Sequence, residues 1–158
     1  MHNTKLERMI QLADEFFEVK NDPAQIAVTE ATMARLREIH PSTLTSEDDE
    51  NGPIAWILII PTTSDVMEQF ITNMINEREL LELTPLHTQY NALYLCSALV
   101  LPEYRGKGFA RRLLREAITS IRRDHPITSL FYWAFSVEGD KLAASMAREF
   151  SMPLHKRL

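Results

Sequence analysis

A short basic turn carries the clearest chemistry in this sequence. Arg105, Gly106, Lys107 and Gly108 follow one another, and apolar residues recur at helical spacing from residue 109 onward. A helix that opens directly after a glycine turn presents unpaired N–H groups and the positive end of its dipole at one place. Glycine lets the backbone approach an anion closely, because no side chain stands in the way. The pattern therefore predicts a phosphate-binding turn.

Two regular elements must position this turn. Residues 91–101 form a nearly continuous apolar run that ends at Pro102, which predicts a strand buried on both faces. Residues 109–123 place Leu113, Leu114 and Ile118 on one side of a helix rich in arginine. The expected order is strand, glycine turn, helix. The alternative is a glycine turn that only joins the strand to the helix.

The segment from Val100 to Ala110, VLPEYRGKGFA, resembles the signature of the GNAT (GCN5-related N-acetyltransferase) superfamily. That signature is Arg/Gln-x-x-Gly-x-Gly/Ala after a strand that ends in Val-x-Pro. The resemblance implies acetyl-CoA as acyl donor, with its pyrophosphate on the backbone N–H groups of the turn and its pantetheine arm along the preceding strand. The donor-binding residues implied in this way are Leu99, Val100, Arg105, Gly106, Lys107, Gly108, Phe109 and Ala110.

By the same resemblance we expect an α/β fold of the GNAT type. Its central sheet would be mixed, mostly antiparallel, splayed at its middle and flanked by helices, after a largely helical N-terminal part. The sequence itself predicts further strands at 54–60, 127–135 and 151–158, and helices at 4–20, 65–84 and from Ser136 onward. Residues 41–53, which include an acidic run at 47–50, predict a solvated loop or the tip of a hairpin. The fold of residues 21–53 stays open.

Composition and charge limit the number of domains, the partners and the location that the sequence allows. With 158 residues, 45% of them hydrophobic, the chain fits one domain, 1–158, with a core of its own. A net charge of -5 argues against general nucleic-acid binding. The absence of a long apolar run or a signal peptide predicts no membrane segment and a cytoplasmic location. The resemblance also allows a homodimer, and the spacing of the histidines predicts no metal site.

The catalytic residues are harder to assign. The family's usual general acid is a tyrosine in the last helix, and Ala147 occupies that position here. Substitutes for the acid are Tyr132, Ser145 and Tyr104, and a CoA thiolate can also leave without an acid. For the general base the candidates are Glu79, Glu82 and His87. The alternative for each, as for Glu103 beside the turn, is an exposed polar residue without a catalytic role.

Cys96 sits inside the strand 91–101, where it is either a small core residue or an acyl-accepting nucleophile. The sequence thus predicts an N-acetyltransferase in which an amine, on a small molecule or a peptide, attacks acetyl-CoA directly. The acidic run at 47–50 either attracts a cationic acceptor or is a charged loop without such a role. Alternatives are a CoA-binding module that has lost catalysis, and a phosphate-binding turn for another nucleotide.

Overall fold

The computed structural model describes residues 4–20, 30–133 and 136–158. In chain order the elements are α1 (Lys5–Lys20), α2 (Glu30–Ile39), β1 (Leu44–Asp49), β2 (Gly52–Thr62), α3 (Ser64–Ile71), α4 (Glu77–Leu83), β3 (Ala92–Val100), the 3₁₀ turn η1 (Pro102–Tyr104), α5 (Phe109–Asp124), β4 (Ser129–Trp133), α6 (Val137–Phe150) and β5 (Leu154–Arg157). None of the described helices has both the length and the apolar character needed to cross a membrane.

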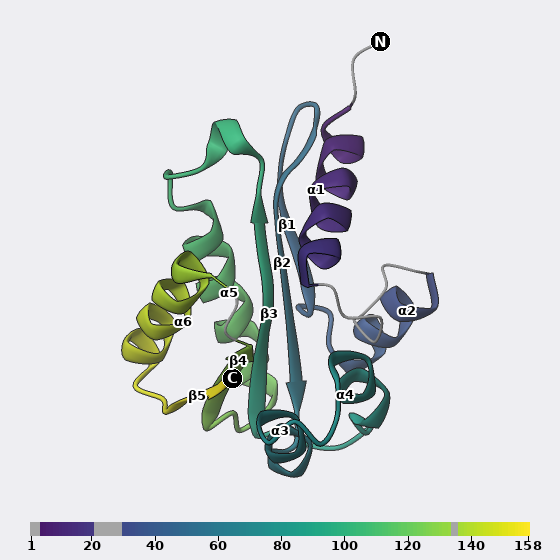
Figure 1. Ribbon diagram of the computed structural model, residues 1–158, viewed down its shortest axis with the longest axis vertical. Helices are drawn as coiled ribbons and strands as arrows, with labels where there is room; N and C mark the ends of the chain where they lie inside the picture. Colours follow the sequence, from purple (N-terminus) through teal and green to yellow (C-terminus); the bar gives the residue numbers. More distant parts are fainter. Residues whose placement is uncertain (1–3, 21–29, 134–135) are drawn as a thin grey trace.

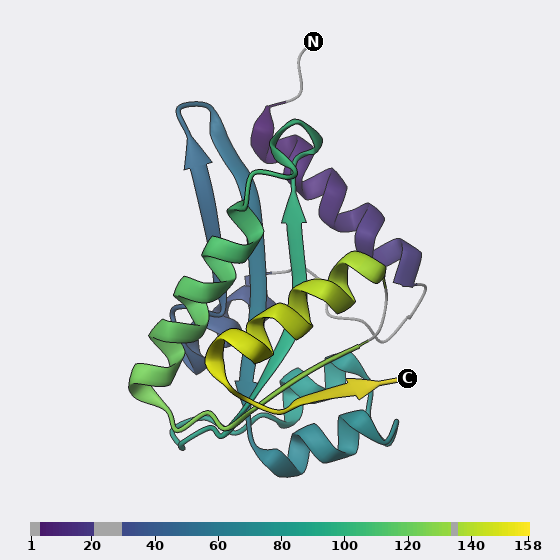
Figure 2. The same ribbon diagram turned by 90° about the vertical axis from the view of Figure 1, so that its left-hand side faces the viewer.

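The strands form one mixed sheet in the order β1-β2-β3-β4-β5. β1 pairs antiparallel with β2, and β2 with β3, and these are the longer ladders. β3 pairs parallel with β4, and β4 with β5. The β3–β4 ladder stops where Leu95 faces Tyr132, whereas β3 continues to Val100, so the two strands diverge (Figure 2). The expected α/β fold with a splayed mixed sheet is confirmed.

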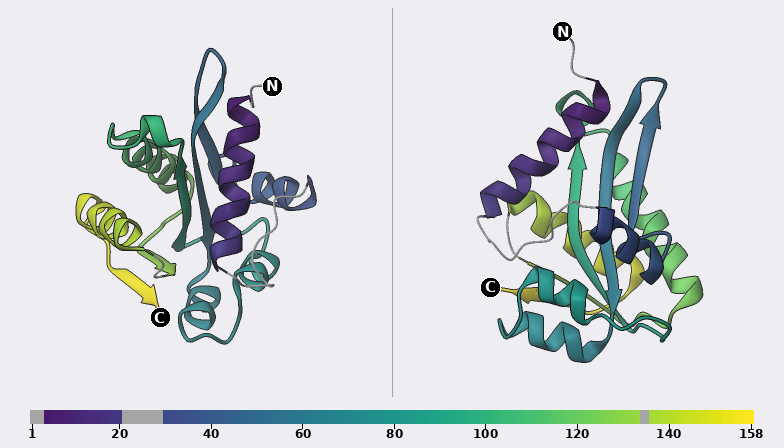
Figure 3. Two further views of the ribbon diagram at one scale, coloured as in Figure 1. Left: turned by 45° about the horizontal axis from the view of Figure 1, so that its top comes forward. Right: turned by 90° about the vertical axis from the view of Figure 1, so that its right-hand side faces the viewer.

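Helices cover both faces of this sheet. α5 and α6 lie on one face, and α1, α2 and α4 lie on the other (Figures 1 and 3). β2 and β3 are covered on both sides, which explains why their sequences are continuous apolar runs instead of alternating ones. Tyr94, Phe70 and Phe131 pack ring against ring at the centre of the core, with centroids 4.9 to 6.0 Å apart.

Two predicted helix starts are confirmed by their caps. In α1, the Glu7 N–H donates to Thr4 Oγ1 at 3.1 Å, and the Thr4 N–H donates to Glu7 Oε2 at 3.2 Å. This is a reciprocal capping box, which satisfies donors that the helix leaves unpaired. In α6, the Gly139 N–H donates to Ser136 Oγ at 2.9 Å. The glycine turn likewise leads into α5 at Phe109, as expected.

The single helix expected over residues 65–84 is wrong. The structure has two helices there, α3 and α4, because Asn73 adopts a left-handed φ of 64° and Asn76 caps a new helix. Arg157 of β5 stabilises the segment between α3 and α4. Its Nε donates to Asn73 Oδ1 at 2.9 Å, and a guanidinium N–H donates to the Ile75 carbonyl at 3.2 Å. A contact so distant in sequence leaves no local signal.

Residues 41–53 contain a hairpin, and the loop alternative is wrong. β1 takes up Leu44–Asp49, and the reversal lies at residues 50–51. β1 is an edge strand that is only partly buried, which lets it carry polar and acidic residues. Of residues 21–53, whose fold the sequence leaves open, residues 21–29 lie outside the described part of the chain.

Candidate functional site

The glycine turn has the backbone geometry that anion binding needs. Gly106 and Gly108 adopt left-handed φ angles of 78° and 82°, which favour glycine. A Cβ at either position would meet no atom within 4 Å, so both face open space. Among the described residues, no side chain caps the N-terminus of α5, and its first turn holds no acidic residue. The N–H groups at this helix start are thus available to a ligand.

A cavity of about 720 Å³ opens beside the turn, in the gap where β3 and β4 diverge. Of the predicted donor-binding residues, Leu99, Val100, Arg105 and Ala110 line it. Arg105 folds back over the end of β3, where its Nε donates to the Val100 carbonyl at 3.0 Å. The other predicted residues, Gly106, Lys107, Gly108 and Phe109, continue the turn into α5 and are not among the described lining residues.

The wall of this cavity is a strand edge interrupted by a bulge. Leu58 of β2 faces Ser97 and Ile59 faces Leu95, so Cys96 is the extra residue of a β-bulge. Residues 95–100 all line the cavity, and beyond Leu95 no strand pairs with β3 on the β4 side among the described residues. Such an edge can pair with an extended ligand chain through its backbone N–H and C=O groups.

A buried carboxylate lies behind the bulge. Glu77, on α4, is 0% exposed, and the Tyr94 hydroxyl donates to its Oε2 at 2.5 Å. The Cys96 thiol donates to the same oxygen at 3.5 Å. Burial, followed by the Glu77 charge, raises the pKa of Tyr94 well above its ordinary value. Cys96 is 7% exposed and lines the cavity, so it is both a core residue and part of the wall.

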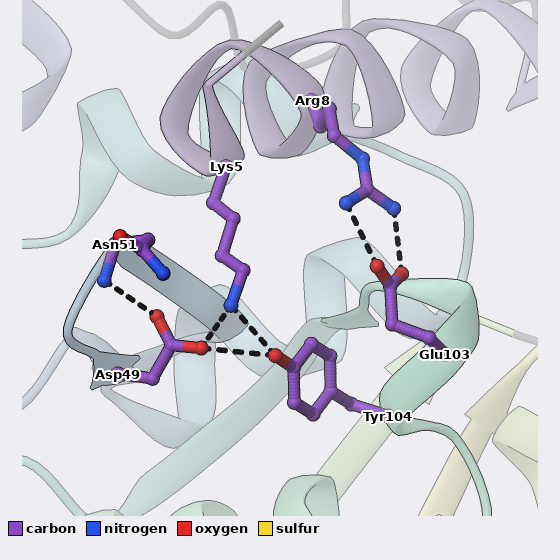
Figure 4. Close-up of polar contacts among 6 residues, drawn as sticks. All are labelled: Lys5, Arg8, Asp49, Asn51, Glu103 and Tyr104. Atoms are coloured by element: carbon purple, nitrogen blue, oxygen red, sulfur yellow. Dashed lines mark hydrogen bonds and ion pairs between the residues drawn. The ribbon is translucent and has the colours of Figure 1, made fainter. Parts of the chain in front are cut away.

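A polar cluster fastens α1 to the turn (Figure 4). Lys5 forms an ion pair with Asp49 and donates to Tyr104 Oη at 2.6 Å, while that hydroxyl donates to Asp49 Oδ2 at 2.9 Å. The Arg8 guanidinium donates two hydrogen bonds, of 2.6 and 2.8 Å, to the Glu103 carboxylate. We call these five residues the α1 clamp. Hydrogen bonds from Lys5 and from Arg8, respectively, lower the pKa values of Asp49 and Glu103 to about 2.

The structure does not bring the six catalytic candidates together. Tyr132 lines the cavity, whereas the other five are absent from its described lining. Tyr104 belongs to the α1 clamp, and Ser145 Oγ accepts a hydrogen bond from Arg111. Glu79 completes the capping box of α4. Glu82 and His87 are exposed, and His87 has a φ of 58°.

Tyr132 is the candidate that the cavity favours. Tyr132 is 8% exposed, and burial, followed by the hydrogen bond that its hydroxyl donates to Asp140, raises its pKa to about 12. The hydroxyl therefore keeps its proton at neutral pH. A free thiol has a pKa of about 8.5, so full proton transfer from Tyr132 to a thiolate would run uphill. Tyr132 suits a hydrogen-bond donor better than a general acid.

Sequence reasoning missed three carboxylates. Glu15 of α1 and Glu138 of α6 line the cavity, and Glu77 lies behind its wall. Glu138 carries the clearest signal, because it falls in the first turn of a helix whose Ser136 cap is evident. Glu15 and Glu77 look like ordinary surface positions of helices, since only tertiary packing places them at the cavity.

Residues 47–50, the acidic run, are not among the described lining residues of the cavity, and a role of this run in attracting a cationic acceptor stays a prediction. Glu47 pairs with Arg112 at 2.7 Å, and Asp49 belongs to the α1 clamp. The described lining contains neither residue. In the part of the chain that the structure describes, no three His, Cys, Asp or Glu side chains form a group that could hold a metal ion.

One family of known proteins matches this chain over most of its length. The profile of the acetyltransferase (GNAT) family matches residues 6–150. No curated protein sequence is significantly similar to the chain. Among solved structures, Chaetomium thermophilum Naa20 in complex with a bisubstrate analogue is similar, with a TM-score of 0.49 and 14% sequence identity. The match covers 87% of this chain and 65% of that chain, so this chain accounts for less than two thirds of its length.

Proposed function

Because this chain belongs to the acetyltransferase (GNAT) family, we propose that it transfers the acetyl group of acetyl-CoA directly to an amine. The observation that carries the proposal is one cavity that joins an unpaired strand edge to an uncapped helix start. We propose further that residues 1–158 act as one acetyltransferase domain. The cytoplasmic location and the homodimer stay predictions from the sequence.

We propose that the donor lies along β3 and ends on the glycine turn. Its pantetheine arm would pair with the backbone of Leu99 and Val100, and its pyrophosphate would sit on the N–H groups of residues 105–110. The free edge of β3 and the left-handed glycines support this arrangement. Lys107 supplies positive charge beside the turn, and Arg105 supplies it at the cavity end of β3.

The amine must lose one proton to water before it attacks the thioester, and its nitrogen loses a second proton to water as the amide forms. For a lysine-like amine of pKa about 10.4, the neutral fraction at pH 7 is roughly one in 2,500, a cost of about 4.6 kcal/mol. The cavity would contribute by holding the amine against the thioester carbon, since orientation replaces a bimolecular encounter. The Tyr132 hydroxyl, which donates to Asp140, would turn from that carboxylate and donate its hydrogen bond to the sulfur as the CoA thiolate departs.

Calorimetric titration with acetyl-CoA tests the donor site. Gly108→Asp and Gly108→Asn form a matched pair, because both side chains have the same size and both tolerate the left-handed region. Asp alone adds a negative charge at the proposed pyrophosphate position. We expect Gly108→Asp to bind acetyl-CoA at least tenfold more weakly than Gly108→Asn. Acetyl-pantetheine, which lacks the pyrophosphate, should not distinguish the two variants. Equal affinities of both variants for acetyl-CoA would contradict the phosphate site.

One observation favours a second candidate function, a CoA-binding module without catalysis. Ala147 stands where the family usually has its acidic tyrosine, and it is buried in the core at 8% exposed. Tight acetyl-CoA binding together with background CoA release across a broad panel of amines would support this alternative. Tighter binding of ATP or NAD than of CoA would instead indicate a site for another nucleotide.

A further inference from the structure

The cavity is lined from both faces of the sheet. Leu114 of α5 and Leu142 of α6 contribute from one face, and Leu12 and Glu15 of α1 contribute from the other. α1 and the α5–α6 pair cover opposite faces (Figure 1). The cavity therefore passes through the opening between β3 and β4. If the donor enters the cavity from the glycine turn, the side of the cavity lined by α1 is left for the acceptor. The inference about the acceptor therefore rests on the proposed function.

The charges along the cavity are unevenly distributed. Arg105 lies where the glycine turn begins, just after β3, and its Nε donates a hydrogen bond to the Val100 carbonyl. The other charged lining residues among those described are two carboxylates, Glu15 and Glu138, from opposite faces of the sheet. Glu15 accepts a hydrogen bond of 3.2 Å from the Gln11 side chain, and neither carboxylate forms an ion pair within the described residues.

Asp140 does not add to this negative charge, because it forms an ion pair with Lys156 at 3.7 Å and accepts a hydrogen bond from Tyr132, which lines the cavity. The walls between the charged groups are apolar, with Leu95, Leu99 and Trp133 among them. Away from Arg105 the charged lining residues among those described are both negative, and a cleft with low-dielectric walls and one sign of charge concentrates ligands of the opposite charge.

We propose that the acceptor is a small cationic amine with an apolar body, which carries a second positive charge besides the reacting nitrogen. The reacting nitrogen must be neutral before it attacks, so it gives up its charge–charge attraction to Glu15 and Glu138 when it loses its proton. A second cationic group keeps its attraction to the carboxylates throughout the reaction. Such an interaction raises kcat/KM, whereas an acceptor with a carboxylate would be repelled.

Three acceptors of equal chain length test this proposal. They are 1,5-diaminopentane, pentylamine and 5-aminopentanoate, which differ in net charge and share the reacting primary amine. Release of free CoA thiol at saturating acetyl-CoA gives kcat/KM for each. We expect 1,5-diaminopentane to exceed 5-aminopentanoate at least tenfold, with pentylamine between them. Equal or reversed values would overturn the proposal.

Charge-neutral variants identify the residues responsible. In the double variant Glu15→Gln/Glu138→Gln, the preference for 1,5-diaminopentane over 5-aminopentanoate should shrink at least fivefold, mainly through KM. Glu68→Gln is the matched control, because Glu68 is exposed on α3 and is not among the lining residues. The control should keep the full preference. A double variant that keeps it as well would overturn the roles of Glu15 and Glu138.

A binding measurement separates this proposal from the proposed function. If acetyl-CoA does not bind at all, the proposed function fails first. If acetyl-CoA binds but no acceptor releases CoA, 1,5-diaminopentane is titrated into the CoA-loaded protein. Binding that the double variant weakens at least fivefold would support a cationic ligand despite the absence of transfer. Absence of diamine binding would overturn the cationic-acceptor proposal while leaving donor binding intact.

Discussion

At the scale of single residues, Tyr132 is the side chain whose position and protonation bear most directly on the proposed acetyl transfer. We expect Tyr132→Phe to lower kcat tenfold or more while the Kd for acetyl-CoA changes less than twofold. The reason is that a hydrogen bond to the departing sulfur strengthens as negative charge develops there. Steady-state kinetics beside calorimetry gives both numbers. An unchanged kcat would remove Tyr132 from the mechanism.

The same residue predicts a change in stability at high pH. The pKa of Tyr132 is about 12 in the folded protein, against an ordinary value of 10.0. Above pH 10 the unfolded chain ionises first, so the folded state is disfavoured as the pH rises toward 12. Urea unfolding at pH 8, 10 and 11.5 should show the wild type losing more stability than Tyr132→Phe. If the free energy of unfolding fell by the same amount with pH in both proteins, the raised pKa of Tyr132 would be refuted.

The buried contact between Glu77 and Tyr94 leads to a prediction about the free energy of unfolding. Removing its carboxylate leaves the buried Tyr94 hydroxyl without its acceptor, so we expect Glu77→Ala to cost about 3 kcal/mol and Tyr94→Phe about 1 kcal/mol. The double variant should cost less than the sum of the two, because both report one interaction. Glu82→Ala, exposed on the same helix, is the control, with an expected change within about 0.5 kcal/mol. Additive costs would mean that the two groups act separately.

The sequence predicts the conformation of the glycine turn better than the positions of the catalytic candidates, for a physical reason. A glycine turn depends on local backbone conformation, so Gly106 and Gly108 reveal it directly. A general base depends on what surrounds it in three dimensions. Glu79 caps a helix, while Glu15 and Glu138 reach the cavity from helices near opposite ends of the chain. No local pattern distinguishes these roles.

At the scale of elements, the α1 clamp links the first helix to the segment that precedes the glycine turn. Arg8 neutralises Glu103, which lies two residues before Arg105 and would otherwise repel an anion at the turn. We therefore expect Arg8→Met to weaken acetyl-CoA binding two- to fivefold, and the effect to shrink in high salt. Adding Glu103→Gln to that variant should restore the affinity. Failure to restore it would mean that Arg8 acts otherwise than by neutralising Glu103.

Elements with strong local signals can be predicted, and those governed by distant contacts cannot. The caps of α1 and α6 are evident from Thr4, Glu7 and Ser136. The apolar runs predict β2 and β3 because burial on both faces leaves few polar positions. The break between α3 and α4 depends on Arg157, and β1 gains its strand character by pairing with β2. Neither cause is visible in a local window.

At the scale of the whole molecule, the divergence of β3 from β4 should govern how the protein responds to its donor. Acetyl-CoA that pairs with residues 96–100 would protect their amides and join the two parts of the sheet. We expect hydrogen exchange in this segment to slow on adding acetyl-CoA, and the unfolding free energy to rise by about 2.7 kcal/mol at a ligand concentration 100 times Kd. Protection confined to the glycine turn would contradict pairing along β3.

The splayed sheet also bears on how the chain folds during synthesis. β1 and β2 form a hairpin as soon as both have emerged, whereas the parallel partner of β3 arrives only after the crossover through α5. Contacts between strands so far apart form late. Until residues 129–133 leave the ribosome, the long apolar strand β3 keeps one whole edge exposed, so a nascent chain that has emerged only to about residue 125 is the form most prone to aggregate.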